Sequence, residues 1–248
     1  MSSRGDFVPG DSDARQPETP IMRNDQLALP FAATRQPTFF NFSGRDNEEL
    51  IAHLSAQPKG FSAMWIHGAS GVGKTHLLQA AVYAQQGFGC RCVLVDAGQI
   101  SIAKDQKRLL ANEFVAVDNV AAWFGERTDE EALFALYQNL VQRGGRLLLS
   151  DEVTPLQRNF LLPDLASRMR AAQVFEIRAL DEIGIRHLLQ RRARDRGLKL
   201  NRQVIDYWLT RRNRSLAALL DDLELLDAAA WQAQHRLTVP FLKSVLTI

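Results

Sequence analysis

One glycine-rich segment has the spacing G-x-x-x-x-G-K-[ST], which is typical of a phosphate-binding loop; residues 68–75 read GASGVGKT. A stretch that predicts a strand precedes it at 62–68, and a pattern that predicts a helix follows at 74–87. In this setting backbone N–H groups surround phosphate oxygens, and the helix N-terminus adds positive potential. A glycine-rich turn with a solvated lysine is the weaker interpretation, because both flanking elements fit. The expected nucleotide contacts in this loop are Gly68, Gly71, Val72, Gly73, Lys74 and Thr75.

Three side chains predict how a nucleotide and its metal would be held. We expect Lys74 to contact the β- and γ-phosphates, and the Thr75 hydroxyl to bind Mg²⁺. The apolar run FVAV ends at Asp118, a carboxylate at the position where a phosphate-loop protein holds the same ion. An aspartate at a strand end can instead cap a turn, so the preceding loop carries much of this prediction.

Two further polar residues end a neighbouring strand pattern. Ser150 and Asp151 follow RLLL, in a strand expected to lie beside the one that ends at Asp118. Side chains there are placed to contact a γ-phosphate. An ordinary strand-to-loop cap explains them equally well, and both interpretations stay open.

Asn119 stands directly after the expected magnesium aspartate. A self-sufficient ATPase usually has a glutamate there, which orients the attacking water. An amide has no charge and does not accept a proton from water as a carboxylate does. The sequence therefore predicts slow intrinsic hydrolysis.

The elements that position these residues alternate between strands and helices as far as about residue 180. Such alternation predicts an α/β fold with a parallel sheet of five strands. Helix patterns occupy 46–57, 74–87 and 128–145, and strand patterns occupy 62–68, 90–97, 114–118, 146–150 and 173–177. Four helical segments follow, at 180–197, 202–212, about 215–235 and 239–248. We expect a leader at 1–37, a nucleotide-binding α/β domain at 38–179 and a small helical domain at 180–248.

The composition excludes several classes of protein. The chain has 248 residues, 46% of them hydrophobic, and its net charge is only +2. No apolar run reaches the roughly 18–20 residues that span a bilayer, and residues 1–24 are polar, so we expect a soluble cytoplasmic protein with a disordered leader. Translation from Met22 rather than Met1 would remove much of that leader.

Cysteines and arginines have unremarkable interpretations in this chain. Cys90 and Cys92 lie one residue apart in what reads as a buried strand, a spacing that suits neither zinc nor a disulfide, so we expect reduced thiols. The arginine-rich segment from Arg186 to Arg214 is interpreted as a solvated helix face. Direct contact with DNA or another polyanion is the less favoured alternative.

Together these motifs resemble the AAA+ module of the bacterial replication initiator DnaA, and more closely its short homologues of the Hda family, the regulatory inactivators of DnaA. The likeness rests on GASGVGKT, VAVDN, LLLSD, LPDLASR at 162–168 and LTVPFLKSVL at 237–246, and it spans about residues 26–248. It implies an AAA+ P-loop NTPase domain with a C-terminal helical lid, ADP or ATP with Mg²⁺ as ligands, and DnaA as partner. Because DnaA continues into a DNA-binding domain, it also implies that this chain reaches DNA only indirectly.

The same resemblance makes a short segment near the N-terminus informative. Residues 26–30 read QLALP and are similar to the peptide with which replication proteins bind the β sliding clamp of DNA polymerase III. Two leucines would enter an apolar pocket while a glutamine hydrogen-bonds at its edge. Hydrophobic entry into the first core element is the alternative. The expected clamp contacts are Gln26, Leu27, Leu29 and Pro30.

Two arginines acquire expected roles from the family. Arg168, in DLASR, matches the arginine finger, which is donated across a subunit interface to a neighbour's γ-phosphate. The sensor-2 arginine of the lid would fall near Ala217, where this chain has none. Arg214 lies three residues earlier on nearly the same helix face and is the expected substitute.

The resulting hypothesis is a negative regulator of replication initiation that binds the clamp and stimulates hydrolysis of DnaA-bound ATP. The alternative is an autonomous AAA+ ATPase, such as a helicase loader or remodelling motor, and Phe124 is the aromatic candidate for a pore loop. A small-molecule kinase with the same loop is a weaker interpretation, because the C-terminal domain is helical. A nucleotide-binding adaptor differs from the main hypothesis only in that it lacks the finger in trans. A homodimer and a mixed assembly with DnaA would use the same surfaces.

Overall fold

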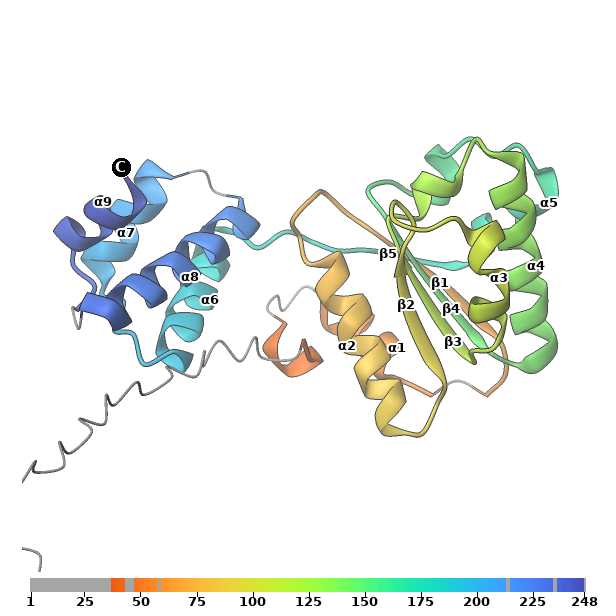
Figure 1. The fold of residues 1–248 in the computed structure, drawn as a ribbon, viewed down its shortest axis with the longest axis horizontal. Helices are drawn as coiled ribbons and strands as arrows, with labels where there is room; N and C mark the ends of the chain where they lie inside the picture. Colours follow the sequence, from red (N-terminus) through yellow and green to blue (C-terminus); the bar gives the residue numbers. More distant parts are fainter. Residues whose placement is uncertain (1–36, 43–46, 58, 213–214, 234–235, 248) are drawn as a thin grey trace, which may run out of the picture. The chain divides into compact units, whose positions relative to one another are not determined.

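The computed structural model describes residues 37–42, 47–57, 59–212, 215–233 and 236–247. Its centre is a parallel sheet of five strands in the order β2-β3-β4-β1-β5, which confirms the predicted α/β fold (Figure 1). The strands are β1 (Ser62–His67), β2 (Cys92–Asp96), β3 (Phe114–Asp118), β4 (Arg146–Asp151) and β5 (Gln173–Glu176). The first strand in sequence is thus inserted between the last two.

Helices cover both faces of this sheet. On one face lie α1 (Glu48–Ser55) and α2 (Lys74–Gly87), and on the other lie α3 (Ile102–Leu110), α4 (Arg127–Arg143) and α5 (Pro163–Arg170) (Figure 1). Alternation along the strands explains the two apolar layers: Trp65 faces the α3–α5 layer, whereas Met64 and Ile66 face the α1–α2 layer. Short 3₁₀ helices in the described residues of this part are η1 (Phe39–Asn41), η3 (Val120–Trp123) and η4 (Pro155–Gln157).

A second, all-helical part follows β5. It comprises α6 (Glu182–Asp195), α7 (Arg202–Arg211), α8 (Leu216–Ala233) and α9 (Val239–Leu246), which confirms the four predicted helices. These helices share an apolar core of their own, in which Trp208, Leu219 and Leu223 are fully buried. Asp181, Asn201 and Thr238 cap α6, α7 and α9 by accepting hydrogen bonds from backbone N–H groups in the first helical turn.

The strand that carries the cysteines differs from the prediction. The sequence pattern predicted a buried strand at 90–97, but β2 is shorter and lies at the sheet edge, where only β3 pairs with it. Both thiols are half-buried and form no disulfide. Burial raises the pKa of Cys90, and it raises the pKa of Cys92 to about 12, so neither thiol is activated.

Candidate nucleotide-binding site

The phosphate-binding loop joins the end of β1 to the start of α2. Gly73, the N-cap of α2, has a φ of 104°, in the left-handed region that favours glycine. A Cβ atom added there would lie 2.8 Å from Cε2 of Phe42, and one added at Gly68 would lie 2.8 Å from the carbonyl oxygen of Ile177. These close approaches explain why residues 68 and 73 are glycines in the motif.

Lys74 is the first residue of α2, and its side chain is bent back into the loop. Its Nζ atom donates hydrogen bonds to the carbonyl oxygens of Gly68, at 2.8 Å, and Ala69, at 3.0 Å. The residue is buried, and among the described residues no carboxylate pairs with it. Both acceptors are uncharged, so the positive charge of this buried ammonium is not balanced by them. A phosphate group would supply the opposite charge.

Asp118 lies where three elements meet, at the end of β3. Its buried carboxylate accepts hydrogen bonds from the hydroxyl of Thr75 at the start of α2 and from the hydroxyl of Ser150 in β4. Hydroxyl and carboxylate oxygens are the ligands that Mg²⁺ prefers. Within the described ranges no group of three or more His, Cys, Asp or Glu residues forms a metal site by itself. The donor set therefore fits an ion that takes its remaining ligands from phosphate and water.

Asn119 is held by its backbone as well as by its side chain. It has a φ of 55°, and its N–H donates to Oγ of Ser150 at 3.1 Å. Its Nδ2 atom lies 3.4 Å from Oδ1 of Asp96 at the end of β2, and the residue lines the cavity described below. Asn119, which follows the aspartate expected to bind Mg²⁺, thus lies beside the phosphate-binding loop.

Asp151 has a different environment from the one expected of a phosphate sensor. Its carboxylate is buried, and Arg158 donates to both oxygens, with Nε–Oδ2 at 2.7 Å and Nη2–Oδ1 at 2.6 Å. Neither Ser150 nor Asp151 is among the residues that line the cavity. The next residue, Glu152, does line it, and sequence reasoning did not single it out.

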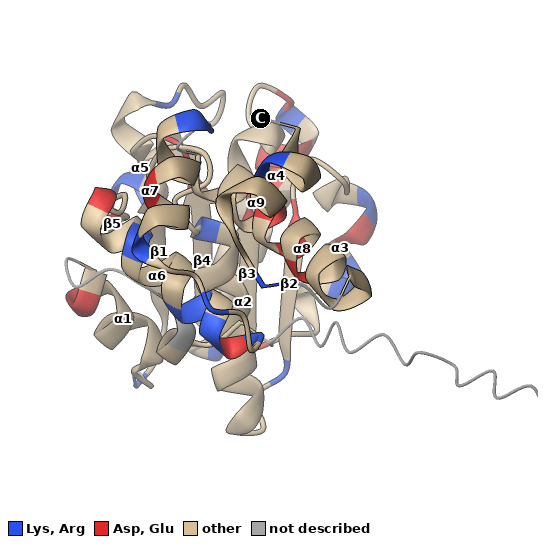
Figure 2. Ribbon diagram, turned by 90° about the vertical axis from the view of Figure 1, so that its left-hand side faces the viewer, with Lys and Arg blue, Asp and Glu red and all other residues tan. Residues whose placement is uncertain are grey.

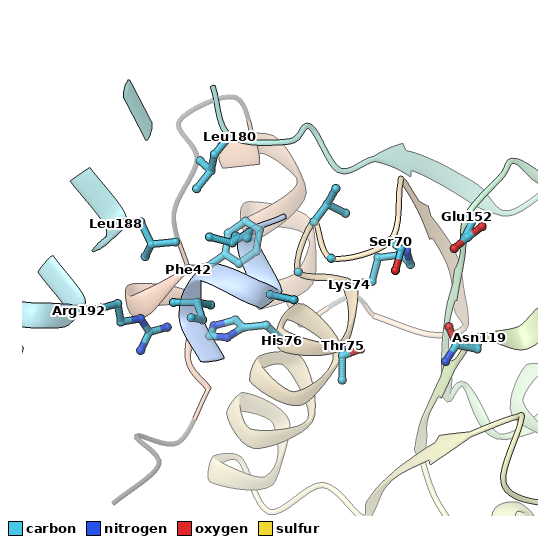
Figure 3. Close-up of a pocket in the computed structure, with 16 residues that line it drawn as sticks. Phe42, Ser70, Lys74, Thr75, His76, Asn119, Glu152, Leu180, Leu188 and Arg192 are labelled. Carbon is cyan, nitrogen blue, oxygen red and sulfur yellow. The ribbon is translucent and has the colours of Figure 1, made fainter. Parts of the chain in front are cut away.

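A cavity of about 390 Å³ adjoins the loop and is lined by residues of the α/β part and of the lid (Figure 3). Asn119 and Glu152 lie toward one end, and an apolar and aromatic group lies toward the other. That second group contains Phe42, His76, Leu180 and Leu188, together with Arg192. The volume of the cavity and its mixed polar and apolar lining are typical of sites that accept a small-molecule ligand.

His76 and Phe42 form the aromatic part of this cavity. Their ring centroids are 5.7 Å apart, and Nε2 of His76 lies 3.1 Å from the carbonyl oxygen of Thr38. Burial, assisted by the charges of Arg192 and Arg191, lowers the pKa of His76 against the opposing effect of the Thr38 carbonyl. A neutral ring is therefore favoured at neutral pH. The sequence signals for this pair were the aromatic-rich segment PTFFNF, which ends at Phe42, and the position of His76 directly after Thr75.

In the lid, Ala217 at the start of α8 lines the cavity, whereas Arg214 lies outside the described residues. The connection into α8 is secured by buried Asp222, which accepts hydrogen bonds from Arg212 and from Nε1 of Trp208. Burial acts to raise the pKa of Asp222, but Arg212 and Trp208 outweigh it and lower that pKa. A substitute role for Arg214 stays a prediction.

Arg168 lies in the last turn of α5 and is not among the residues that line the cavity. Its side chain is exposed, and within the described part of the chain it makes no hydrogen bond or ion pair. The predicted clamp contacts Gln26, Leu27, Leu29 and Pro30 fall outside the described residues.

Several arginines in the described part of the arginine-rich segment pair with acids of the lid. Arg186 pairs with Glu182 and Asp206, Arg196 lies 3.5 Å from Glu224, and Arg212 pairs with Asp222. Figure 2 shows basic and acidic residues interspersed along the ribbon. Pairing of this kind leaves less free positive charge for a polyanion. In the described residues no helix is both long and apolar enough to cross a membrane.

Comparisons with known proteins place this geometry in a family. Residues 38–176 match the model of the bacterial DnaA ATPase domain, and residues 181–246 match the model of the Hda lid domain. These two matches cover most of the described chain, and the first alone spans more than half of the sequence.

Solved structures share the fold at low sequence identity. DnaA from Aquifex aeolicus bound to AMPPCP is 20% identical, with a TM-score of 0.68 over 80% of this chain and 67% of that chain. Domain III of DnaA from Thermotoga maritima is 17% identical, with a TM-score of 0.75 over 86% of this chain and 96% of that one. A DNA replication initiation factor is 20% identical, with a TM-score of 0.67 over 80% of this chain. The match spans 66% of that factor, just under two thirds of its length.

The match to the DnaA ATPase domain includes the phosphate-binding loop, and the match to the Hda lid domain includes the four helices α6–α9. The chain therefore belongs to the family of bacterial DnaA ATPase domains, as an AAA+ module with an Hda-type lid domain.

Proposed function

We propose that this chain is a negative regulator of replication initiation, which holds ADP or ATP with Mg²⁺ mainly as a structural ligand and activates hydrolysis of ATP bound to DnaA. Arg168 is the catalytic group, donated in trans to the nucleotide of the partner. Residues 26–30 bind the β sliding clamp and so bring the chain to DNA indirectly. The Hda-type lid supports DnaA as the partner.

Nucleotide binding is supported by three features of the loop and cavity. Lys74 is a buried cation without an acidic partner in the described residues, Asp118 and Thr75 present oxygen ligands, and the neighbouring cavity has an aromatic lining. In the related AMPPCP-bound DnaA structure the same fold holds an adenine nucleotide analogue. When bound, Mg²⁺ would neutralise phosphate charge, while Thr75 and Asp118 hold the ion and Lys74 orients the phosphates.

A mainly structural role for this nucleotide follows from Asn119. Its side chain lies beside the loop but carries no charge, so it does not activate water as a general base. Bound nucleotide would instead join the α/β part to the lid, since the residues that line the cavity come from both.

The position of Arg168 is the observation that carries the proposal. In a parallel sheet each connecting helix returns the chain from the C-terminal end of one strand to the N-terminal end of the next. Arg168, at the end of α5, therefore lies toward the N-terminal ends of the strands, where β5 begins. The phosphate-binding loop lies at the C-terminal ends of the strands, and α2 and α5 pack on opposite faces of the sheet. An exposed guanidinium in this place is poorly situated for its own nucleotide and well situated for a neighbour's.

The test is the rate of DnaA-ATP hydrolysis in the presence of clamp-loaded DNA, with wild type or Arg168→Ala. We expect the variant to lose on the order of 10² in the stimulated rate, which is the usual cost of removing one group that stabilises transition-state charge. Arg170→Ala is the matched control, because Arg170 is also exposed in the last turn of α5. Equal stimulation by wild type and Arg168→Ala would exclude the finger.

One observation favours the second candidate, an autonomous AAA+ ATPase. Glu152 presents a carboxylate to the same cavity as Asn119 and is a candidate base for water. Against a remodelling motor, the pore-loop candidate Phe124 is packed inward, stacked on Trp65 with ring centroids 6.1 Å apart. A rapid intrinsic ATPase rate that Glu152→Gln abolishes, without DnaA or clamp, would support this function in place of the first.

A further inference from the structure

A buried carboxylate on α4 joins the start of the helix that carries Arg168. Glu130 is 0% exposed, although a charged side chain is seldom fully buried without a partner. Its partners are three backbone N–H groups: Gly125 and Leu161 donate to Oε1, at 3.1 and 3.0 Å, and Leu162 donates to Oε2, at 2.9 Å. Both oxygens of the carboxylate are therefore satisfied, and in the described chain no cation takes part.

Two of these donors stand at the beginning of α5. Leu162 is the N-cap residue of this helix, and its own side chain is apolar, so the helix has no side-chain cap of the usual kind. Glu130 approaches from α4 and accepts from the N-cap N–H and from the N–H before it. The negative charge also lies near the positive end of the α5 dipole.

The other contacts of α5 are apolar. Leu165, Ala166 and Met169 bury one face against the α4 side of the core, which limits rotation of the helix about its axis. In the loop before the helix, Phe160 and Leu162 pack against the same core, whereas Leu161 is 55% exposed. The backbone hydrogen bonds to Glu130 are thus the polar contacts that join the start of α5 to α4.

We propose that Glu130 is a positioning residue for the trans-acting arginine: it holds the N-terminus of α5 so that Arg168, in the last turn of the same helix, points toward the partner's phosphate. The inference rests on the proposed function of Arg168. Glu130 does not touch the partner's nucleotide. It acts through the direction of a helix of eight residues, in which a small tilt at the first turn displaces the guanidinium at the last.

The test variant is Glu130→Gln, which keeps the size of the side chain but replaces one acceptor oxygen with an NH₂ donor that faces N–H groups. Glu131→Gln is the matched control, since Glu131 is exposed and pairs only with Arg127 one turn earlier. We expect Glu130→Gln to lower the maximal stimulated rate of DnaA-ATP hydrolysis by about 10- to 100-fold, because displacement of a reacting group by about 1 Å has effects of that order. The concentration of the chain that gives half-maximal stimulation should not change.

A double-mutant cycle separates positioning from general damage. If Glu130 acts through Arg168, Glu130→Gln has no further effect on the rate in the Arg168→Ala background. An equal fractional loss in both backgrounds, or a loss that appears only as a higher half-saturating concentration, overturns the proposal. Failure of Arg168→Ala to reduce the rate would instead refute the proposed function, so the two failures are distinguishable.

Hydrogen exchange and a second variant keep the test informative if Glu130→Gln does not fold. In the wild-type chain the amides of Leu161 and Leu162 should be protected from exchange, although they lie in and next to a loop. Exchange at the rate of an open loop would remove the contact on which the inference depends. Glu130→Asp retains both acceptors but retracts them by one methylene group, and we expect a smaller loss of the same maximal rate; no loss would also contradict the proposal.

Discussion

The Thr75 hydroxyl donates a hydrogen bond to the Asp118 carboxylate and thereby joins the start of α2 to the end of β3. These are the two oxygen ligands expected for Mg²⁺, and the fold brings them together. The site is therefore preorganised, because folding has already placed both groups. Metal binding would need to break this hydrogen bond but would require little movement of the backbone.

The first prediction concerns this pair. Thr75→Val removes the hydroxyl, so we expect Mg²⁺ to strengthen nucleotide binding by the wild type but not by the variant, a difference of roughly tenfold or about 1.4 kcal/mol. The measurement is the affinity for a fluorescent ADP with Mg²⁺ and with EDTA. Thr210→Val is the control, because that hydroxyl bonds only to a backbone carbonyl within α7. An unchanged Mg²⁺ dependence in Thr75→Val would contradict the assignment.

The second prediction concerns the shape of the phosphate-binding loop. Gly73→Ala forces an L-residue into a φ of 104° and places a Cβ atom 2.8 Å from the Phe42 ring, so we expect nucleotide affinity to fall by at least tenfold. Gly60→Ala is matched to it, because Gly60 also has a positive φ, of 89°, but no atom lies within 4 Å of the added Cβ. Calorimetric titration should show weakened binding for the first variant alone.

The third prediction concerns the dependence of stability on pH. The folded chain lowers the pKa of His76, so below the ordinary value of about 6.5 the unfolded chain binds a proton that the folded chain does not. Stability of the nucleotide-free protein should therefore fall as pH decreases from about 7 to about 5. Urea unfolding of His76→Gln should show a shallower fall, whereas His187→Gln, at an exposed position, should follow the wild type. An identical slope for wild type and His76→Gln would exclude this origin.

The fourth prediction concerns the clamp peptide in residues 26–30. Leu27→Ala and Leu29→Ala remove the two apolar side chains that would enter the clamp pocket, so the double variant should no longer be captured by immobilised β clamp. Stimulation of DnaA-ATP hydrolysis should then be weak at low concentrations of the chain and recover at high concentrations, since tethering only raises the local concentration. Undiminished capture by the clamp would remove this part of the proposal.

Local patterns in the sequence predicted most of the elements, but two helices were not identified. Neither α3 nor α5 was predicted, although LPDLASR was singled out as a motif. Both are short and polar, and only a few apolar residues, such as Leu165 and Met169 in α5, show which side is buried. The edge position of β2 was also missed, because the order of strands in a parallel sheet depends on long-range pairing that local periodicity does not encode.

Predictions about the surroundings of side chains also depended on whether a local motif was sufficient. The motif grouped Lys74, Thr75 and Asp118, and in the structure Thr75, next to Lys74, donates a hydrogen bond to Asp118. Asp151 was grouped with them by its place at a strand end, but its carboxylate pairs with Arg158, seven residues later in a loop. Which direction a side chain takes at a strand end depends on the loop that folds over it.

The sequence by itself determined which groups are candidates for chemistry: a glycine-rich loop with a lysine and threonine, an aspartate that ends an apolar run, an amide after it, and an arginine in a family motif. Each is a local pattern in which residue type and spacing are sufficient. Only the tertiary structure decided that Arg168 and the loop lie toward opposite ends of the strands, and that buried Glu130 accepts hydrogen bonds from the backbone at the start of α5. Those relationships come from packing between elements distant in the chain, which no local pattern specifies.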